Sequence, residues 1–537
     1  MDKLYKIHFL TISKFLILLL VVFSFQLSGQ NPLDNMIRLT ESKSFILKWK
    51  DYSPYIADFN RNDDEIYVQY YPNSKAEKFL KENIPYFNCP DQELEKTYYF
   101  RWWTFRKHIK KTPAGFVITE FLPDVPWAGK YNTICCPAGH HFYEGRWLHD
   151  QKYMENYANF WFKGGGEPRR YSFWAANSIL AFACVPQNKN LVTSLLPYFD
   201  QNYQEWEKTH LCADGLFQQT DNRDGMEVSI GGSGKRATIN SYMIGDAEAI
   251  ATIADMAGKI SLKKTYKVKA TGLKSLLINK LWNENDGFFE TLPINSDTLV
   301  GVRELHGYTP WYFNIPEDKH SSAWKYLLMN DGFKAPFGPT TAEQNNPGFK
   351  VIYEGHECQW NGPSWPFATS VTLKAMANLL HNYSQTIVSK SDYIQQLNTF
   401  SNSHRRINEN GKQVCWIDEN LNPYTGDWIS RTMLKSKNAL PKERGKDYNH
   451  SSFCDLIISD LIGVQPSMSN QLTIDPLVTS YYWDWFCLDH VKYHNKILTI
   501  LWDRDGSKYQ KGKGFSVFVD GELKHNSKTI ERIEIQL

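Results

Sequence analysis

Helical periodicity, broken by loops rich in glycine, proline and aromatic residues, is the feature that most constrains the fold of this chain. Between residues 150 and 465, apolar residues recur at spacings of three and four, which is the pattern of one buried helix face. The clearest such segment follows Asn240 and stops at Gly258. Others cover residues 273–281, 373–380 after Pro366, and 453–461 before Gly463. Paired helices with loops at one end predict a mainly α fold, a barrel of helical hairpins over residues 111–465.

The two ends of the chain differ from this helical region. Residues 497–501 and 515–519 have the composition of strands, Asp520-Gly521 is a hairpin signal, and residues 530–537 form a further candidate strand. We therefore expect a small C-terminal β-domain over residues 472–537. Residues 30–110 are expected to pack on the barrel as an N-terminal segment. Within them, the aromatic stretch from Tyr98 to Arg106 fits either a helix or a strand.

The first 29 residues have the pattern of a secretory signal. Lys3, Lys6 and Lys14 form a basic start, an apolar run covers residues 15–25, and small residues follow. The run is too short to span a bilayer comfortably. We expect cleavage near Gly29, export to the periplasm or the exterior, and no stable membrane span afterwards. An uncleaved N-terminal anchor is the alternative.

Charge and composition narrow the choice of partner. The formal net charge is +2, and residues 1–29 carry three lysines and one aspartate, so the mature chain is close to neutral. No basic arm or arginine stripe is present, which argues against a nucleic-acid partner. The 18 tryptophans and 30 tyrosines offer flat apolar faces suited to sugar rings, although an aromatic core explains them equally. Nine cysteines without C-x-x-C spacing argue against zinc-ribbon and thioredoxin folds, and no cofactor is expected.

The first segment with candidate catalytic side chains is the loop of residues 221–234. Asp221, Asp224 and Glu227 lie within seven residues, with Arg223 between them and glycines after them. Such a loop presents carboxylates without burying them in a helix. The alternative interpretation is a solvated loop or a calcium turn, but calcium needs more oxygen ligands in a tight run.

Two later segments complete the pattern. Residues 353–366 contain Trp360, Asn361 and Trp365 between proline and glycine, which predicts a rigid wall facing a ligand. The alternative interpretation is that this segment is only the start of a helix, for which Pro366 is the one residue required. Residues 416–427 place Glu419 beside an Asn-Pro-Tyr-Thr-Gly turn. Glu227 and Glu419 are far apart in sequence, so only a closed fold brings them together.

In this order, the Asp-Gly-Met-Glu, Trp-Asn-Gly-Pro-Ser-Trp-Pro and Glu-Asn-Leu-Asn-Pro-Tyr-Thr-Gly segments resemble the six-hairpin glycosidases of the mannosylglycerate hydrolase and glycoside hydrolase family 63 type. Family 37 trehalases are more distantly similar. The resemblance spans about residues 140–465 and implies an (α/α)6 six-hairpin barrel with a small C-terminal β-domain. It implies that Glu227 is the general acid, that Trp360 to Trp365 line the sugar site, and that Glu419 is the base.

One departure from that family concerns the acid. The family uses Asp at the position where this chain has Glu227, and Asp224 lies three residues earlier. Glu227 is favoured, and Asp224 is the alternative. The resemblance implies hydrolysis of an α-linked glucoside, mannoside or rhamnoside, as a glycoside or oligosaccharide, by inversion. Inversion requires two carboxyl groups about 6.5–9.5 Å apart, with room for a water.

Two further loops hold weaker candidates. Residues 139–150 contain three histidines and an aspartate, but their spacing matches no metal site. We expect Glu144, Arg146 and Trp147 to contact sugar rather than a metal. Trp311 belongs to another aromatic loop that is expected to line the cleft.

Three other functions compete with hydrolysis. A phosphorolytic enzyme would use phosphate in place of the base, and the presence of Glu419 argues against it. A non-catalytic carbohydrate-binding protein would need neither glutamate. A polysaccharide lyase on the same barrel would use tyrosine, histidine or arginine to abstract a proton rather than two distant acids.

Overall fold

The computed structural model describes residues 46–537, so the predicted export signal at residues 1–29 lies outside the described residues. Residues 47–537 belong to one unit of the structure. Within residues 46–537, every helix is too short or too polar to cross a lipid bilayer.

Helices dominate the middle of the chain, as the periodicity predicts. The segment after Asn240 is α10 (Ala237–Met256), and residues 273–281 end the longer helix α11 (Ile260–Leu281). Residues 373–380 lie in α14 (Pro366–Asn382), where the proline occupies the first turn. The fourth predicted helix is a π-helix, Leu456–Leu461, in which the Ile462 N–H donates to the carbonyl of Ile457, five residues back.

The remaining helices of this region range from 4 to 22 residues in length. They are α6 (Ala138–Gly145), α7 (Lys152–Lys163), α8 (Ala175–Cys184), α9 (Lys189–His210), α12 (Thr309–Tyr312), α13 (Lys325–Leu328), α15 (Lys390–Ser403) and α16 (Ile429–Ser436). Short hairpins punctuate them: β2 (Ile109–Thr112) with β3 (Gly115–Ile118), β4 (Trp282–Asn283) with β5 (Phe288–Phe289), and β6 (Arg405–Ile407) with β7 (Gln413–Cys415).

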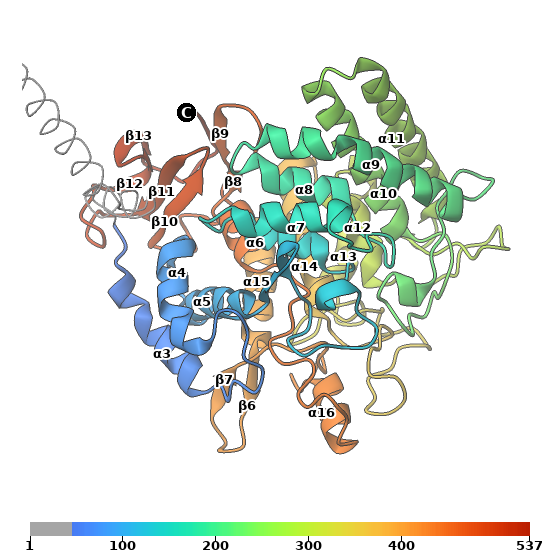
Figure 1. Cartoon of the computed structure of the whole chain (residues 1–537), viewed down its shortest axis with the longest axis horizontal. Helices are drawn as coiled ribbons and strands as arrows, with labels where there is room; N and C mark the ends of the chain where they lie inside the picture. The colour runs from blue at the N-terminus through green and yellow to red at the C-terminus, as the bar shows by residue number, and fades with distance from the viewer. Residues whose placement is uncertain (1–45) are drawn as a thin grey trace, which may run out of the picture. The chain divides into compact units, whose positions relative to one another are not determined.

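The helices differ in how much of their circumference is buried. Helices α10 and α14 are buried on nearly every face, whereas α11 buries a single stripe that includes Leu273 and Leu277. Helix α10 packs against α8, α9 and α11, and Figure 1 shows this group side by side. Gly245 permits close packing, because a Cβ atom there would lie 2.3 Å from the ring of Phe313. The mainly α fold is therefore confirmed.

The N-terminal segment consists of α3 (Ser53–Arg61), α4 (Ala76–Asn83), β1 (Tyr86–Asn88) and α5 (Gln92–Lys107). The stretch from Tyr98 to Arg106 is helical and almost wholly buried. Asp91 caps α5, since its carboxylate accepts the N–H groups of Glu93 and Leu94.

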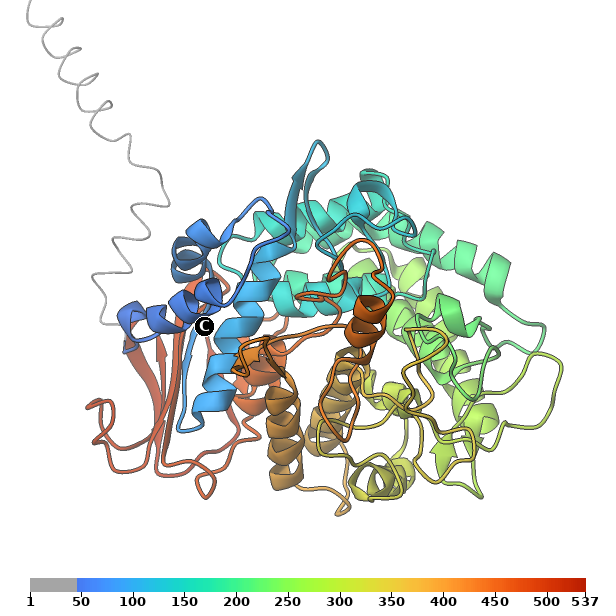
Figure 2. The ribbon, with the colours of Figure 1, turned by 90° about the horizontal axis from the view of Figure 1, so that it is seen from below.

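The C-terminal region forms two antiparallel sheets, and its predicted strands are confirmed. The larger sheet has the order β1, β10 (Trp485–Tyr493), β11 (Lys496–Asp503), β12 (Gly514–Val519), β13 (Glu522–Ser527). The smaller one joins β14 (Ile533–Gln536), β9 (Gln471–Ile474) and β8 (Val464–Gln465). Asp520 and Gly521 have φ of 52° and 80°, as a two-residue hairpin turn requires. Strand β1 comes from the N-terminal segment and pairs with β10 in the larger sheet. Figure 2 shows the strands of this sheet beside α3–α5.

Candidate active site

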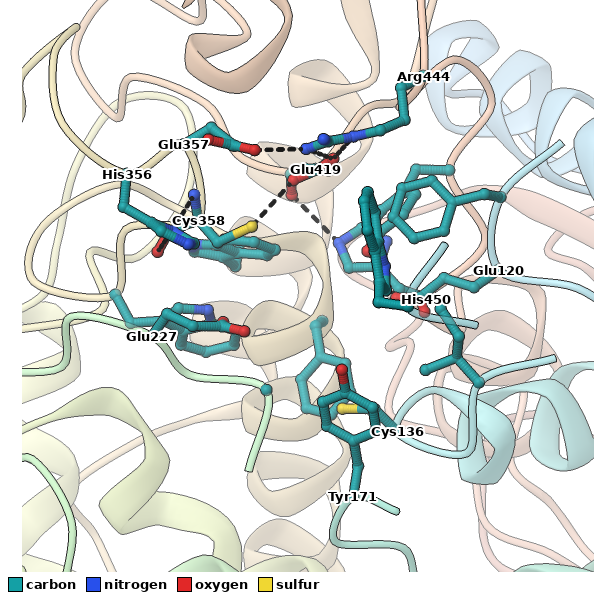
Figure 3. A pocket seen from close by; sticks show the side chains of 18 residues that line it. Glu120, Cys136, Tyr171, Glu227, His356, Glu357, Cys358, Glu419, Arg444 and His450 are labelled. Carbon is teal, nitrogen blue, oxygen red and sulfur yellow. Dashed lines mark hydrogen bonds and ion pairs between the residues drawn. The ribbon is translucent and has the colours of Figure 1, made fainter. Parts of the chain in front are cut away.

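A cavity of about 340 Å³ opens among the loops that connect the helices (Figure 3). Its polar lining is dominated by carboxyl groups and its apolar lining by aromatic rings. The lining residues are Glu120, Phe121, Trp127, Ile134, Cys136, Tyr171, Gly225, Glu227, His356, Glu357, Cys358, Trp360, Trp365, Phe367, Glu419, Arg444, Tyr448 and His450. Glu227 and Glu419 therefore line the same cavity, although they are far apart in sequence.

Glu227 enters the cavity from the loop between α9 and α10. The loop turns sharply on either side of it, since Gly225 and Val228 have φ of 71° and 66°. The Glu227 carbonyl accepts the N–H of Trp360 at 3.0 Å, which ties the loop to the tryptophan segment. Burial raises the pKa of the Glu227 carboxyl to about 7, and the negative charge of Glu419 acts in the same direction.

Asp224 has a different environment from Glu227. Its side chain is fully buried and forms an ion pair with Arg236 at 2.8 Å. Thr238 donates a second hydrogen bond to the same carboxylate oxygen. Asp224 does not line the cavity, and its interactions hold the loop against the start of α10. Of the two candidate acids, Glu227 is therefore the one that lies in the cavity.

Glu419 is fully buried and is held by several donors. The Arg444 guanidinium donates to its Oε1 from Nη2 at 3.1 Å and from Nε at 3.3 Å. The Ser430 hydroxyl and the Cys358 thiol each donate to Oε2 at 3.3 Å. The backbone N–H of Glu419 donates to Asp418, so both the side chain and the backbone of Glu419 are fixed.

Arg444 also reaches a second carboxylate of the cavity. Its Nη2 donates to Glu357 at 3.0 Å, and its guanidinium lies 4.9 Å from the ring centroid of Trp127. Burial of Glu357 opposes ionisation, but hydrogen bonds from its own backbone and from Arg444 outweigh this effect and lower the pKa of Glu357. Arg444 thus serves two carboxylates at once.

The predicted tryptophan wall is present. The rings of Trp360 and Trp365 are stacked, with centroids 4.7 Å apart and an interplanar angle of 19°. The indole N–H of Trp365 donates to the Gln359 carbonyl at 2.7 Å, and Trp365 immediately precedes α14. Asn361 lies between the two tryptophans in sequence and is buried, but it does not line the cavity.

Three predicted sugar contacts lie in the protein interior instead. The Glu144 carboxylate accepts the backbone N–H groups of residues 453–455 and so caps the chain at the start of the π-helix. Arg146 and Trp147 both donate to Asp455, at 2.8 and 2.7 Å. None of the three lines the cavity, so their placement does not support the predicted sugar contact. Their polar groups form hydrogen bonds between the end of α6 and the start of the π-helix, so they are not free to contact a sugar.

Trp311 also departs from its predicted place on the cleft. It is fully buried, and its ring lies 5.5 Å from Phe289 and 5.7 Å from Trp324, centroid to centroid. It fills the core around α12, which is the structural role that aromatic residues most often have.

The sequence pattern did not single out Glu120, Arg444 or Tyr448 as cavity residues. Glu120 follows β3, and Tyr448 donates to its carboxylate at 2.6 Å. Burial raises the pKa of Glu120 to about 8, with the charges of Glu419 and Glu227 contributing. None of the three residues belongs to a recognisable motif, so only their positions in space identify them.

Cysteine and histidine side chains offer no metal site in the described part of the chain. Among residues 46–537, no group of three or more potential ligands is placed to hold a metal ion. His140 and His141 are buried and bonded to Ser452, Tyr157 and the Asn449 carbonyl. All nine cysteines are free thiols in this structure.

The helix-rich fold, with carboxyl groups around a tryptophan-lined cavity, has the features of a glycoside hydrolase domain, and comparison with known families agrees. Residues 130–451 match the mannosylglycerate hydrolase MGH1-like glycoside hydrolase domain. Because this match covers more than half of the chain, the protein belongs to that family. Residues 468–525 match the C-terminal domain of glycosyl hydrolase family 65.

Individual relatives are similar to different extents. A solved structure named sialidase is 42% identical with a TM-score of 0.85, over 91% of this chain and 45% of that one. The family 63 mannosylglycerate hydrolase from Thermus thermophilus, in complex with Tris and D-glycerate, shares the fold at 10% identity and a TM-score of 0.50, over 68% and 100% of the chains. An uncharacterized protein of Borreliella burgdorferi is 27% identical over 171 residues, which are 32% of this chain and 36% of that protein. The matched regions thus cover less than half of the sialidase and of the Borreliella protein.

Proposed function

We propose that this chain hydrolyses an α-linked glycoside with Glu227 as general acid and Glu419 as general base. The observation that carries the proposal is the contrast between two carboxyl groups of one cavity. Burial raises the pKa of Glu227 to about 7, whereas Glu419 forms an ion pair with Arg444 at 3.1 Å. Paired carboxyl groups in opposite environments are what glycosidases use to assign the acid and base roles.

The proposed mechanism is inverting. Protonated Glu227 gives its proton to the glycosidic oxygen as the bond to the anomeric carbon breaks, and the carboxylate of Glu419 removes a proton from the attacking water. The sugar that leaves carries the inverted anomeric configuration. An α-glucoside, α-mannoside or α-rhamnoside is the proposed substrate, as expected from the family resemblance.

The cavity suits a single glycosyl group. Its volume of about 340 Å³ lies at the lower end of small-molecule sites, which cover about 300–1,000 Å³. The stacked rings of Trp360 and Trp365 offer an apolar surface to the apolar face of a sugar ring. The carboxyl groups around them supply hydrogen bonds to hydroxyls.

Sialidase activity is not carried over from the similar structure of that name. This chain covers 45% of that protein, so the activity of the whole protein does not transfer. A sialic acid also carries a carboxylate, which arginine binds best. Arg444, the arginine that lines this cavity, already donates to Glu357 and Glu419.

An (α/α)6 barrel of six hairpins is the proposed architecture behind this site. The nearly complete burial of α10 and α14, beside helices such as α11 that bury one stripe, supports an inner and an outer set. The shared fold with the family 63 hydrolase supports it further. Export, as expected from residues 1–29, is also part of the proposal.

The test is hydrolysis of a panel of aryl α-glycosides by the wild type and by Glu227→Gln and Glu419→Gln. Each variant should lose turnover by roughly 10²–10⁴-fold while its thermal unfolding stays cooperative. Glu354→Gln is the matched control, because Glu354 lies in the same loop as His356 but is exposed and outside the cavity lining. NMR of the first product tests inversion. Binding without turnover in the wild type would replace the hydrolase with a carbohydrate-binding protein.

A further inference from the structure

A third carboxyl group of the cavity has no part in the acid–base pair. Glu120 is 7% exposed and lines the cavity. Its carbonyl accepts the N–H of Asn449 at 3.1 Å, and the neighbouring Thr119 carbonyl accepts the Asn449 side-chain amide at 3.2 Å. These bonds fix the backbone of Glu120 against the segment that carries Tyr448 and His450. Glu120 is thus held rigidly at the cavity wall.

The hydrogen bonds of Glu120 differ from those of the other cavity carboxylates. Tyr448 donates to Oε1 at 2.6 Å, and no other residue within 46–537 donates to the carboxyl group. Glu357 and Glu419 each receive the Arg444 guanidinium, whereas no cation in the described part of the chain pairs with Glu120. One carboxyl oxygen of Glu120 therefore remains available to a ligand.

The surroundings of Glu120 favour its neutral form at pH 7. Burial is the main cause that raises its pKa to about 8, and the charges of Glu419 and Glu227 act in the same direction, while the hydrogen bond from Tyr448 opposes them. While the Tyr448 hydroxyl donates a hydrogen bond to Oε1, the proton of the neutral acid is carried by the other carboxyl oxygen. That oxygen then acts as a donor, not only as an acceptor.

We propose that Glu120 is a specificity-determining residue whose carboxylic acid donates a hydrogen bond to one hydroxyl of the glycosyl group bound against Trp360 and Trp365. Figure 3 shows Glu227 and Glu120 entering the cavity from opposite sides, with Glu419 between them. Because Glu120 lies across the cavity from the proposed acid, we assign its contact to the sugar ring rather than to the departing oxygen. The inference rests on the proposed function, because it assigns the cavity to a sugar.

A donor role makes a specific demand on substitutions. Glu120→Gln keeps a carbonyl oxygen for Tyr448 and supplies an N–H donor to the sugar, so it should work nearly as well as the wild type. Glu120→Met fills a similar volume without a donor, and Glu120→Ala is the second such variant if Met prevents folding. Asp246→Asn is the control: Asp246 is a buried carboxyl with a pKa raised to about 8 by burial, but its Oδ1 accepts the N–H of Asn177, outside the cavity.

The experiment measures the rate of hydrolysis of the p-nitrophenyl α-glycosides of glucose, mannose and rhamnose. Calorimetry measures the binding of the methyl α-glycosides of the same three sugars. Monodeoxy analogues of the preferred sugar are included. Glu120→Met and Glu120→Ala should each lower kcat/KM, or affinity, by roughly 10- to 100-fold for the parent sugar, because one buried hydrogen bond is lost. The same variants should lose discrimination against a single deoxy analogue, and Gln should retain it.

The outcomes separate this inference from the hydrolase proposal. Turnover by the wild type with no position-specific loss in Glu120→Met would remove the role of Glu120 and leave the hydrolase intact. A loss in Glu120→Gln equal to that in Glu120→Met would show an ionised acceptor and also overturn the inference. If sugar binding depends on Glu120 but no turnover occurs, the hydrolase proposal is overturned and the hydroxyl contact is supported. If the wild type shows neither binding nor turnover, both the hydrolase proposal and the inference about Glu120 are overturned.

Discussion

The Arg444 guanidinium donates two hydrogen bonds to one oxygen of the Glu419 carboxylate, at 3.1 and 3.3 Å. Glu419 is fully buried and Arg444 is 8% exposed, so water screens this pair little. The same guanidinium donates to Glu357, which makes Arg444 the counter-charge for two carboxylates of the cavity. We therefore expect loss of this one cation to affect both stability and activity.

Arg444→Met should destabilise the fold by about 3–5 kcal/mol, because it leaves a buried carboxylate without its partner. Turnover should fall as well, since the proposed base loses the groups that orient it. Urea denaturation and kcat on the best aryl glycoside measure the two effects. Arg431→Met is the control: Arg431 pairs with Glu443 at 2.7 Å in a more exposed place, and its loss should cost about 1 kcal/mol or less. Equal losses in the two variants would contradict the prediction.

The pH profile of activity should report the proton on Glu227. The general acid works only when protonated, and the pKa of Glu227 is raised to about 7 by burial. We therefore expect kcat/KM to fall as pH rises through about 7, with a slope of one proton up to about pH 8, where Glu120 also ionises. Initial rates between pH 5 and 9 measure this limb. Glu120→Gln should keep it, and a limb centred below pH 5 would exclude Glu227 as the acid.

The same pKa predicts how stability depends on pH. Since the pKa of Glu227 in the folded protein lies above its ordinary value of 4.5, the stability that the neutral form gives is complete below pH 4.5 and is lost as pH rises to about 7. Glu227→Gln cannot ionise and escapes this loss. Its free energy of unfolding should exceed that of the wild type by on the order of 2 kcal/mol at pH 8, with no difference at pH 4. Glu354→Gln, in an exposed position, should show no such pH-dependent gain.

Asp224→Asn separates the two candidate acids. It breaks the buried ion pair with Arg236, so we expect a loss of about 3–5 kcal/mol in stability. The fraction that stays folded should retain the alkaline limb near pH 7. Chemical denaturation measures the free energy of unfolding, and initial rates at several pH values measure the alkaline limb. Asp221→Asn, in the same loop, is the control. A stable Asp224→Asn enzyme without activity, beside an active Glu227→Gln, would make Asp224 the acid.

Removal of residues 466–537 should prevent the helical part from folding to a soluble protein. Strand β1 pairs with β10, and Phe87 in β1 is fully buried beside its partner Leu488. The Leu477 and Val478 N–H groups also donate to the Leu461 carbonyl at the end of the π-helix. The truncated chain would expose these apolar and polar groups together. Its yield in the soluble fraction, beside that of the full chain, is the measurement, and a soluble active fragment would contradict the expectation.

Local patterns predict the elements of this fold well. The helix after Asn240 and the helix after Pro366 follow from apolar spacing, and the hairpin at Asp520-Gly521 follows from two residues that tolerate positive φ. The loops that carry Glu227 and Glu419 follow from their similarity to a family. The helices and the hairpin depend on neighbours within a few residues, which a single sequence displays.

The roles of individual polar residues depend on partners far along the chain. Glu144 accepts backbone N–H groups of residues 453–455, and Arg146 forms an ion pair with Asp455. Glu120 joins the cavity through Tyr448, which lies in a segment near the other end of the helical region. Burial and charge pairing arise only when these distant segments meet. The sequence alone therefore determined which elements form and which loops carry acids, whereas the tertiary structure decided which acids face a ligand, because desolvation and ion pairing are properties of the folded neighbourhood.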